Sequence, residues 1–592
     1  MCAGNLRRYD RGQFTTTTGT DLMRLLAGLP RLIAYSLLAG AAVLGGCAAV
    51  APRAPLSCEQ LATLTVPSAS IGLPTNGAKV VSAVSVAASG VAPKNFGAYC
   101  QVAGEISPID PAAPKIKFQI AMPVQWNHRA LMLGGGGYGG TVPNVAGNVP
   151  AGPSDSPNPV GRGYAVFGSD SGHEGQSNQG WFGANDEALK NFSYEALKKT
   201  RDAALFLIDQ RYGERPQRSY FAGGSTGGRE ALAVAQKWPK DFDGVISLYP
   251  AFNAASLDLQ FGRITRALAQ PGAFLNLAKR KALYDAAYQA CDGFDGVVDG
   301  LISNQPACNA SFNPSTAVLN GKPLRCERGD DTGDTCLSDA QIAAMNVINT
   351  PIKFNYPLAN GDAQYPGFNA WGADFGHVGT APLQAYVNFL GMSTVAPAYP
   401  MPAPPLTVPP AAGPPYGSTF WDQWIKYFVT RDVNFNSFTI DPENPGPWAA
   451  RISELTGWQD ANKADLSDFE SRGGKILMAH GTSDQLVSTR ATEQYYGRVR
   501  AAMGVGRADG FLRFYEIPGY NHAASTTFNA AWDSVTALEN WVEKGVAPPD
   551  QVVFDTVGVP GRSRPLCVYP GWPKYKGGGD VNAAASFVCV GS

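Results

Sequence analysis

The sequence lacks a charge excess of either sign, because 47 lysines and arginines stand against 48 aspartates and glutamates in 592 residues. This balance provides no electrostatic surface for a phosphate backbone or an anionic membrane, so nucleic acid is not an expected partner. The chain has no C-x-x-C spacing, which argues against zinc and redox sites of that kind. Histidine is scarce, with five in the chain, so few side chains are candidates for a general base.

The N-terminal segment is predicted to be an export signal. Arg24 and Arg31 precede an apolar run at 32–46, which is too short to span a bilayer comfortably and has the length of a signal-peptide core. The run ends in Leu44-Gly45-Gly46-Cys47, which is similar to a bacterial lipobox. Residues 1–47 are therefore expected to direct the protein to the periplasm, to the outer membrane through a lipid on Cys47, or out of the cell. An ordinary signal peptide with an incidental cysteine is the alternative.

Eight cysteines remain when Cys2 and Cys47 are set aside from the ten in the chain. They lie in locally spaced couples, and an oxidising compartment favours disulfides between them. Pairing of sequence neighbours predicts four disulfides: Cys58–Cys100, Cys291–Cys308, Cys326–Cys336 and Cys567–Cys589.

The order of apolar runs predicts an α/β fold. From about residue 115, short apolar strands alternate with helical segments. Strands are predicted at 117–122, 129–133, 164–168, 219–222 and 244–249, and an amphipathic helix is predicted at 194–211. The rhythm stops near residue 250 and resumes at 475–479 and 511–517. We interpret this as one mostly parallel sheet, built from 48–250 and 471–592, with a lid domain at 251–470 inserted over its carboxyl edge. This is the organisation of an α/β-hydrolase fold with a large inserted lid.

The motif Gly223-Gly224-Ser225-Thr226-Gly227-Gly228 lies between the apolar run at 219–222 and a helix-like stretch at 229–237. In a strand–turn–helix context, G-x-S-x-G is typical of a nucleophile elbow, whose sharp turn needs glycines and exposes the serine hydroxyl. Ser225 is therefore the candidate nucleophile. A plain glycine-rich turn is the alternative.

A serine nucleophile needs a base and an acid that orients the base. In α/β-hydrolases the chain order is serine, acid, histidine, each after a strand. His522 follows the predicted strand 511–517, and Asp484 follows the strand 475–479, so these two complete the candidate triad with Ser225. The remaining histidines are expected in structural or surface positions: His128, His173, His377 and His480.

An oxyanion hole needs two backbone N–H donors near the nucleophile. One is expected from Thr226, the residue after Ser225, and the other from Gly134 or Gly135 in the glycine run 134–140 after an early strand. Phosphate binding is the competing use of such a run, but the chain contains no G-x-x-x-x-G-K-[ST] motif.

Three carboxylates occur at steps of three and four in the lid: Asp292, Asp295 and Asp299. Separated by glycines, they can surround a hard cation, with backbone carbonyls completing the coordination. The spacing is not that of an EF-hand. We expect structural calcium here, with the Cys291–Cys308 disulfide closing the loop; a solvated acidic turn is the alternative.

With these motifs the chain resembles the tannase and feruloyl esterase family, which includes mono(2-hydroxyethyl) terephthalate hydrolase. The resemblance covers most of 55–592 and implies an α/β-hydrolase fold with a lid that hydrolyses esters of aromatic carboxylic acids. It assigns the triad to Ser225, Asp484 and His522. It assigns the calcium ligands to Asp292, Asp295, Asp299 and the carbonyls of Val297 and Leu301. The motifs that carry it are 134–140, 170–173, 223–228, 292–301, 480–484, 518–522 and 564–567.

One departure from the family concerns the triad. Many members have cysteines just before the serine and just after the histidine, and these form a disulfide, whereas this chain has Gly224 and Ala523. The triad is therefore expected to be held by packing alone, with a more mobile His522 loop. The lid also lacks an obvious counterpart of the arginine that grips a carboxylate in the terephthalate hydrolase.

The expected substrate is a small phenolic ester. Trp421 and Trp424 would stack on the aromatic acid, or else form the core of the lid. The alternatives are a terephthalate monoester hydrolase, another acyl hydrolase such as a peptidase, and a non-catalytic, calcium-stabilised surface binding protein. The sequence does not indicate the oligomeric state.

Overall fold

The backbone is organised by a ten-stranded sheet in the order β1-β2-β3-β4-β6-β5-β7-β8-β13-β14. The computed structural model describes residues 54–92, 95–375, 383–404 and 412–591. The predicted export signal at 1–47, with Cys47, and His377 lie outside these residues. The strands of this sheet are β1 Thr65–Val66, β2 Ala78–Val86, β3 Tyr99–Ile106, β4 Ile116–Pro123, β5 Arg129–Leu133, β6 Ala165–Ser169, β7 Arg218–Gly224, β8 Gly244–Leu248, β13 Lys475–Gly481 and β14 Leu512–Ile517.

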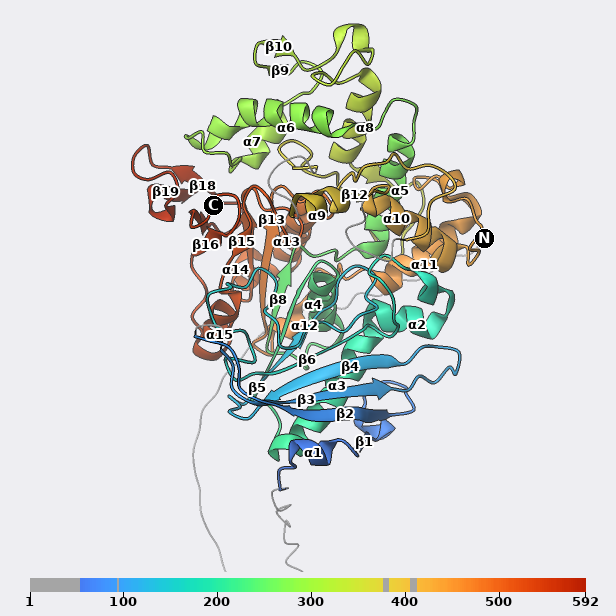
Figure 1. Cartoon of the computed structure of the whole chain (residues 1–592), viewed down its shortest axis with the longest axis vertical. Helices are drawn as coiled ribbons and strands as arrows, with labels where there is room; N and C mark the ends of the chain where they lie inside the picture. Colours follow the sequence, from blue (N-terminus) through green and yellow to red (C-terminus); the bar gives the residue numbers. More distant parts are fainter. Residues whose placement is uncertain (1–53, 93–94, 376–382, 405–411, 592) are drawn as a thin grey trace, which may run out of the picture. The chain divides into compact units, whose positions relative to one another are not determined.

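The sheet has an antiparallel and a parallel part. Strands β1 to β4 pair antiparallel, as does β4 with β6, and β2, β3 and β4 lie side by side in Figure 1 (blue). The strands from β6 through β5, β7, β8 and β13 to β14 are parallel. All seven predicted strands lie in this sheet, within two residues of the expected bounds. Strands β1 to β3 were not predicted.

Both faces of the parallel strands are buried. In β13, Ile476 and Met478 belong to one hydrophobic cluster, and Leu477 and Ala479 belong to another. This alternation follows from the two-residue period of a strand, and parallel strands covered on both sides are accordingly apolar throughout. Helices α3, α4 and α13 contribute to the first cluster, and α15 contributes to the second.

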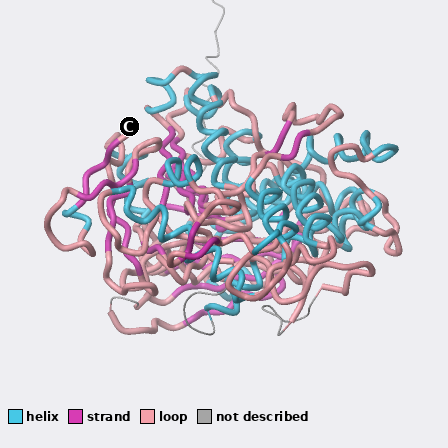
Figure 2. Tube along the Cα trace, turned by 90° about the horizontal axis from the view of Figure 1, so that it is seen from above, coloured by secondary structure: helices cyan, strands magenta, loops and turns pink. Residues whose placement is uncertain are grey.

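Helices and loops cover the sheet, and loops form much of the trace in Figure 2 (pink). Of the helices in the described residues, none is long and apolar enough to cross a membrane. Their bounds are α1 Cys58–Leu61, α2 Asp186–Lys190, α3 Ala196–Tyr212, α4 Thr226–Lys237, α5 Ala254–Leu268, α6 Leu277–Cys291, α7 Gln305–Ser311, α8 Asp339–Asn349, α9 Leu383–Leu390, α10 Tyr416–Gln423, α11 Ala449–Gln459, α12 Ser467–Glu470, α13 Thr489–Met503, α14 Val505–Asp509 and α15 Ser534–Lys544.

A long insertion separates two neighbouring strands of the sheet, because β8 and β13 pair although residues 249–474 lie between them. The insertion carries α5 to α12 and two small hairpins: β9 Val318–Leu319 with β10 Lys322–Pro323, and β11 Ile352–Lys353 with β12 Gln364–Tyr365. It is not a separate unit, since residues 53–592 form one compact unit. After β14, the chain leaves the main sheet and forms two small sheets: β15 Ala530–Ala531, β16 Gln551–Asp555 and β17 Ser563–Leu566, and β18 Trp572–Tyr575 with β19 Phe587–Val590.

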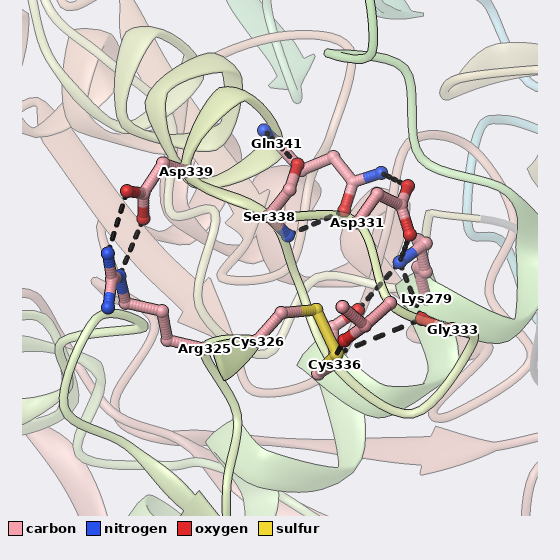
Figure 3. Close-up of a disulfide and its surroundings, with 10 residues drawn as sticks. Lys279, Arg325, Cys326, Asp331, Gly333, Cys336, Ser338, Asp339 and Gln341 are labelled. Carbon is pink, nitrogen blue, oxygen red and sulfur yellow. Dashed lines mark hydrogen bonds and ion pairs between the residues drawn. A yellow bond between two sulfur atoms is a disulfide. The ribbon is translucent and has the colours of Figure 1, made fainter. Parts of the chain in front are cut away.

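The four predicted disulfides are present with the predicted pairing. Figure 3 shows the Cys326–Cys336 disulfide in the insertion. Lys279 of α6 donates hydrogen bonds of 2.7 Å to the carbonyls of Gly333 and Cys336 and pairs with Asp331 at 2.9 Å. The disulfide and this buried lysine together fix a loop with little regular structure of its own.

Candidate active site

The turn between β7 and α4 has the geometry of a nucleophile elbow. Ser225 has φ 59° and ψ −123°, a backbone conformation that is rare for residues other than glycine. A Cβ atom on Gly223 would lie 2.4 Å from the carbonyl of Gly227, and one on Gly228 would lie 2.6 Å from the Leu248 carbonyl. The glycines of the motif are therefore required by close backbone approach, as the sequence predicted.

Three side chains from the carboxyl ends of β7, β13 and β14 meet in a hydrogen-bonded chain. Ser225 Oγ lies 2.9 Å from His522 Nε2, and His522 Nδ1 lies 2.8 Å from Asp484 Oδ2. Asp484 is fully buried and His522 is 3% exposed. An ionised carboxylate only accepts hydrogen bonds, so Nδ1 carries the imidazole proton and Nε2 is left to accept the serine proton. The structure thus brings the three predicted residues together.

Asp484 receives four hydrogen bonds. Its Oδ1 accepts from the amides of Leu486 and Val487 at 2.9 and 2.8 Å, and its Oδ2 is shared by His522 and, at 3.1 Å, His480 Nε2. Burial alone would raise the pKa of Asp484, but the charges and hydrogen bonds of the two imidazoles hold this pKa below its usual range. The acid is therefore ionised across the neutral range, as an orienting group for His522 must be.

The expected oxyanion donors are corrected in part. The amide of Gly134 donates to the Ala222 carbonyl at 3.0 Å, and the amide of Gly135 donates to Glu230 Oε2 at 2.9 Å, so neither N–H is free. The amides of Thr226, Gly136 and Gly137 have no acceptor among the described residues. Thr226 therefore remains the first candidate donor, and Gly136, which directly follows Gly135 in the loop, replaces Gly134 and Gly135 as the second.

The carboxyl group of one buried residue and the backbone carbonyl of another hold the glycine loop. Glu230 on α4 accepts from the Gly135 amide, and burial raises its pKa above the usual range. The Asp170 carbonyl accepts from Gly140 N–H at 2.9 Å, and burial raises the pKa of the Asp170 carboxyl to about 7. His173, two residues beyond Ser171, is buried and stacks on Phe182 with ring centroids 3.6 Å apart, consistent with the structural position expected for it.

A cavity of about 390 Å³ opens at Ser225 and His522. Aromatic side chains from the glycine loop, from the segment between β6 and β7 and from the insertion line much of it: Tyr138, Phe192, Tyr249, Phe261, Tyr386, Tyr416 and Phe420. Such a cavity suits an aromatic or other apolar group.

Trp421 and Trp424 do not line this cavity, so their predicted role in stacking on a substrate is wrong. Both indoles are fully buried, and their N–H groups donate to the Ser437 carbonyl at 3.3 Å and to Gln459 Oε1 at 3.0 Å. They form the core of the lid, the alternative that the sequence left open. Phe420, beside Trp421 in the same helix, points to the cavity instead.

The space at Gly224 is filled by an aromatic ring. A Cβ atom there would lie 2.5 Å from the ring and hydroxyl of Tyr249, which also packs edge-on against His522 at 5.0 Å. The loop that carries His522 is also held by hydrogen bonds, which corrects the prediction that packing alone would hold the triad. Asn521 Oδ1 accepts from the amides of Gln485 and His522, at 3.1 and 2.8 Å.

The acidic loop of the insertion offers only oxygen donors. Asp295 Oδ2 is buried without a partner, and burial, together with the charge of Asp299, raises the pKa of Asp295 to about 6. Asp292 accepts from the Gly300 amide at 2.9 Å, while Asp299 pairs with Arg564. No group of three or more His, Cys, Asp or Glu side chains in the described part of the chain is arranged to hold a metal ion. The donor chemistry suits calcium, although the carboxylates are not gathered around one point.

Several residues around the site were missed by the sequence reasoning. Glu230 follows Arg229 directly after the motif, and two adjacent charged residues in an apolar helix are a signal of buried polar contacts. Asp258 and Tyr138 also line the cavity, but no sequence motif marked them as residues of the site. His480 was expected to pack under its loop, and it does so, but its bond to Asp484 was not foreseen. His128 is a surface group paired with Glu214, as expected.

Comparison with known proteins places this geometry in context. The family model described as tannase and feruloyl esterase matches residues 100–590. An uncharacterised esterase of Agrobacterium fabrum is 38% identical over 96% of this chain and 99% of its own length. Mono(2-hydroxyethyl) terephthalate hydrolase of Piscinibacter sakaiensis is 30% identical over 83% of this chain and 85% of its own. The crystal structure of feruloyl esterase B from Aspergillus oryzae superposes with a TM-score of 0.68 at 25% identity, covering 90% of this chain and 99% of that one.

Proposed function

The chain belongs to the tannase and feruloyl esterase family and is a carboxylic ester hydrolase, and from this premise we propose that it cleaves esters of aromatic carboxylic acids of the feruloyl esterase or tannase type. The observation that carries the proposal is the chain of hydrogen bonds from Ser225 through His522 to Asp484, which opens into a cavity lined by aromatic rings.

Acylation begins with attack of Ser225 Oγ on the ester carbonyl carbon. His522 Nε2 takes the serine proton, and Asp484 stabilises the resulting imidazolium at 2.8 Å from Nδ1. The carbonyl oxygen becomes an oxyanion that accepts hydrogen bonds from the amides of Thr226 and Gly136, each worth about 3 kcal/mol in comparable enzymes. Nε2 then returns the proton to the leaving alcohol, and the acyl group stays on Ser225.

Deacylation repeats these steps with water as the nucleophile. His522 takes a proton from water, the hydroxide adds to the acyl carbon, and the collapse of the tetrahedral intermediate releases the free acid. The proton on His522 returns to Ser225 Oγ, so the sum is ester plus water to acid plus alcohol. Asp484 remains ionised throughout, consistent with its low pKa.

The proposal includes calcium as a structural ion and export of the protein. Asp292, Asp295, Asp299 and the carbonyls of Val297 and Leu301 would hold the ion, which would neutralise a buried acidic loop remote from the bond that is broken. The four disulfides support an oxidising compartment. A lipid on Cys47 would be the only attachment to the membrane.

The test is release of free acid from methyl ferulate, methyl gallate and mono(2-hydroxyethyl) terephthalate by the purified protein with calcium. Ser225→Ala should lower kcat on every accepted ester at least 1,000-fold, roughly the loss that follows removal of a triad member in serine hydrolases. Because this serine is small and partly exposed, the variant should unfold at the wild-type temperature, which excludes misfolding as the cause. Equal turnover by the variant and the wild type would overturn the mechanism.

A further inference from the structure

One face of α5 forms a wall of the cavity. Ala254, Leu257, Asp258 and Phe261 recur at the spacing of a helix face, and all four line the cavity. Asp258 is the single carboxylate on that wall. Of the described residues around the cavity none is lysine or arginine, so an anion bound there would meet no cationic partner.

Asp258 contacts the glycine loop through Tyr138, which also contacts Phe420 of the lid. The Tyr138 hydroxyl lies 3.2 Å from Asp258 Oδ2 and also 3.2 Å from the carbonyl oxygen of Phe420. One hydroxyl proton shared between two acceptors makes a weaker three-centre bond, whereas a proton on Asp258 makes each contact a separate hydrogen bond. In that arrangement Tyr138 donates to the Phe420 carbonyl and accepts from Asp258.

The protonated form also agrees with the surroundings of Asp258, whose side chain is 3% exposed. Burial raises the pKa of this carboxyl well above its usual range, and the charge of Asp460 raises it further. Burial and the two Tyr138 contacts thus both favour the protonated form of Asp258, which can accept or donate a hydrogen bond without bringing a charge into the cavity.

The second oxygen of Asp258 is open to the cavity. No donor among the described residues reaches Asp258 Oδ1. This oxygen is also not among the fully buried side-chain atoms that lack a hydrogen-bond partner, so it is accessible. In a cavity lined mostly by aromatic rings, such an oxygen is the place where a hydroxyl group of a ligand would bind. Without a ligand, the oxygen would accept its hydrogen bond from water instead.

We propose that Asp258, oriented by Tyr138, determines specificity by accepting a hydrogen bond from a hydroxyl group on the aromatic ring of the substrate. The inference rests on the proposed ester hydrolysis and narrows its substrate to uncharged, ring-hydroxylated acids. A terephthalate monoester would place its free carboxylate in a cavity whose described lining has an acid and neither lysine nor arginine, and burial of an unpaired charge is costly. Terephthalate monoesters are therefore poor substrates of this enzyme.

The competing view is that Asp258 serves only to hold Tyr138, and through it the glycine loop. The two roles differ in what they do to specificity. If the role is structural, substitution of Asp258 lowers kcat/KM for all esters by the same factor. If the role is recognition, substitution changes the ratio of kcat/KM between two esters that differ only in the ring hydroxyl.

The experiment measures kcat/KM for two matched pairs: methyl 4-hydroxycinnamate with methyl cinnamate, and methyl gallate with methyl benzoate. The wild type should favour the hydroxylated member of at least one pair by tenfold or more, and mono(2-hydroxyethyl) terephthalate should be turned over more slowly than that member. Asp258→Leu should lose about tenfold more on the hydroxylated ester than on the unsubstituted ester, the value of one buried hydrogen bond.

Two further variants keep the result interpretable. Asp258→Asn retains a carbonyl acceptor and should restore most of the preference lost in Asp258→Leu. Tyr138→Phe keeps the ring but removes the hydroxyl, and should weaken the preference less than Asp258→Leu does. An equal loss on both members of each pair would overturn the inference, as would a wild type with no hydroxyl preference. Absence of any Ser225-dependent turnover would instead overturn the proposed function.

Discussion

At the scale of single residues, two imidazoles share one carboxylate oxygen. His480 Nε2 lies 3.1 Å from Asp484 Oδ2 and 3.2 Å from the Val487 carbonyl, which can only accept, so Nε2 carries a proton. Its Nδ1 lies 2.8 Å from Thr492 Oγ1, within hydrogen-bond distance. His480 thus donates through Nε2 to the same Asp484 oxygen that His522 contacts, and it helps to fix that carboxylate.

We predict that His480→Asn lowers kcat about tenfold, the effect of one lost hydrogen bond to a charged group, and leaves KM for the same ester unchanged. The reason is that Asp484 orients the base and does not contact the substrate. Thr492→Val is the matched control, because it removes only the hydroxyl group beside His480 Nδ1 and should lower kcat less. Steady-state kinetics at one pH measure both variants. An unchanged kcat in His480→Asn, or a loss confined to KM, would contradict the positioning role.

The residues predicted from the sequence were those fixed by chain order and local spacing. Ser225, Asp484 and His522 each follow a strand of the parallel sheet, and strands of this kind end at one edge. The second oxyanion donor was misplaced because the direction of a glycine amide depends on Glu230, which is distant from that loop in sequence. The tryptophans were misplaced because composition does not reveal which side of a helix faces the cavity.

At the scale of elements, the turn after β8 supports the turn after β7. Tyr249 directly follows β8 and has φ 32°, and its amide donates to the Ala479 carbonyl at 2.7 Å. Its ring covers Gly224 and contacts His522 edge-on. A single aromatic side chain therefore fills the space in which other family members are expected to have a disulfide.

We predict that Gly224→Ala destabilises the protein, because its new Cβ would lie 2.5 Å from the Tyr249 ring. Overpacking of this kind costs about 1 to 3 kcal/mol. In a Tyr249→Ala background the same substitution should cost much less, so a double-mutant cycle should give a coupling of about 1 kcal/mol or more. Urea unfolding measures each variant. Additive costs would show that Tyr249 does not restrict Gly224.

Elements with a strong periodic signal were predicted well, and those without one were missed. The buried parallel strands are short apolar runs between glycines or charged residues, which is a distinct pattern. Strand β2 is half exposed and rich in serine and alanine, so its alternation was too weak to recognise. Helix α5 was recognised only as part of the insertion, because its lining of the cavity depends on how the lid packs.

At the scale of the whole molecule, no disulfide in the described residues joins the lid to the sheet. Two of them lie within the insertion, one lies near the N-terminal strands and one near the C-terminus. Polar contacts join lid and core instead. Arg229 donates to the Gln459 carbonyl at 3.2 Å, and the Tyr138 hydroxyl reaches the Phe420 carbonyl. Lid and core must therefore fold together for the cavity to form.

The proposed calcium ion would be a further contribution to stability at this scale. Burial raises the pKa values of Asp292, Asp295 and Asp299; the charges of Asp299 and Asp292 raise that of Asp295 further, and the charge of Asp292 raises that of Asp299. A cation bound only to the folded state stabilises it by about 2.7 kcal/mol at 100 times its dissociation constant. For a chain of this length that free energy corresponds to a rise of roughly 2 °C in Tm.

We therefore predict that EGTA lowers the Tm of the wild type, that excess calcium restores it, and that magnesium does not, because magnesium requires a tighter octahedral site. Asp295→Asn should have nearly the same Tm with and without calcium, since it loses the unpartnered oxygen that the ion would take. Asp330→Asn is the control, because this exposed lid aspartate lies outside the loop and should respond to calcium as the wild type does. A wild-type Tm that is independent of calcium would contradict the prediction and would mean that only protons neutralise the buried carboxylates. Asp295→Asn should then raise the stability at pH 7, since it removes a carboxyl that would otherwise be forced to ionise in a buried loop.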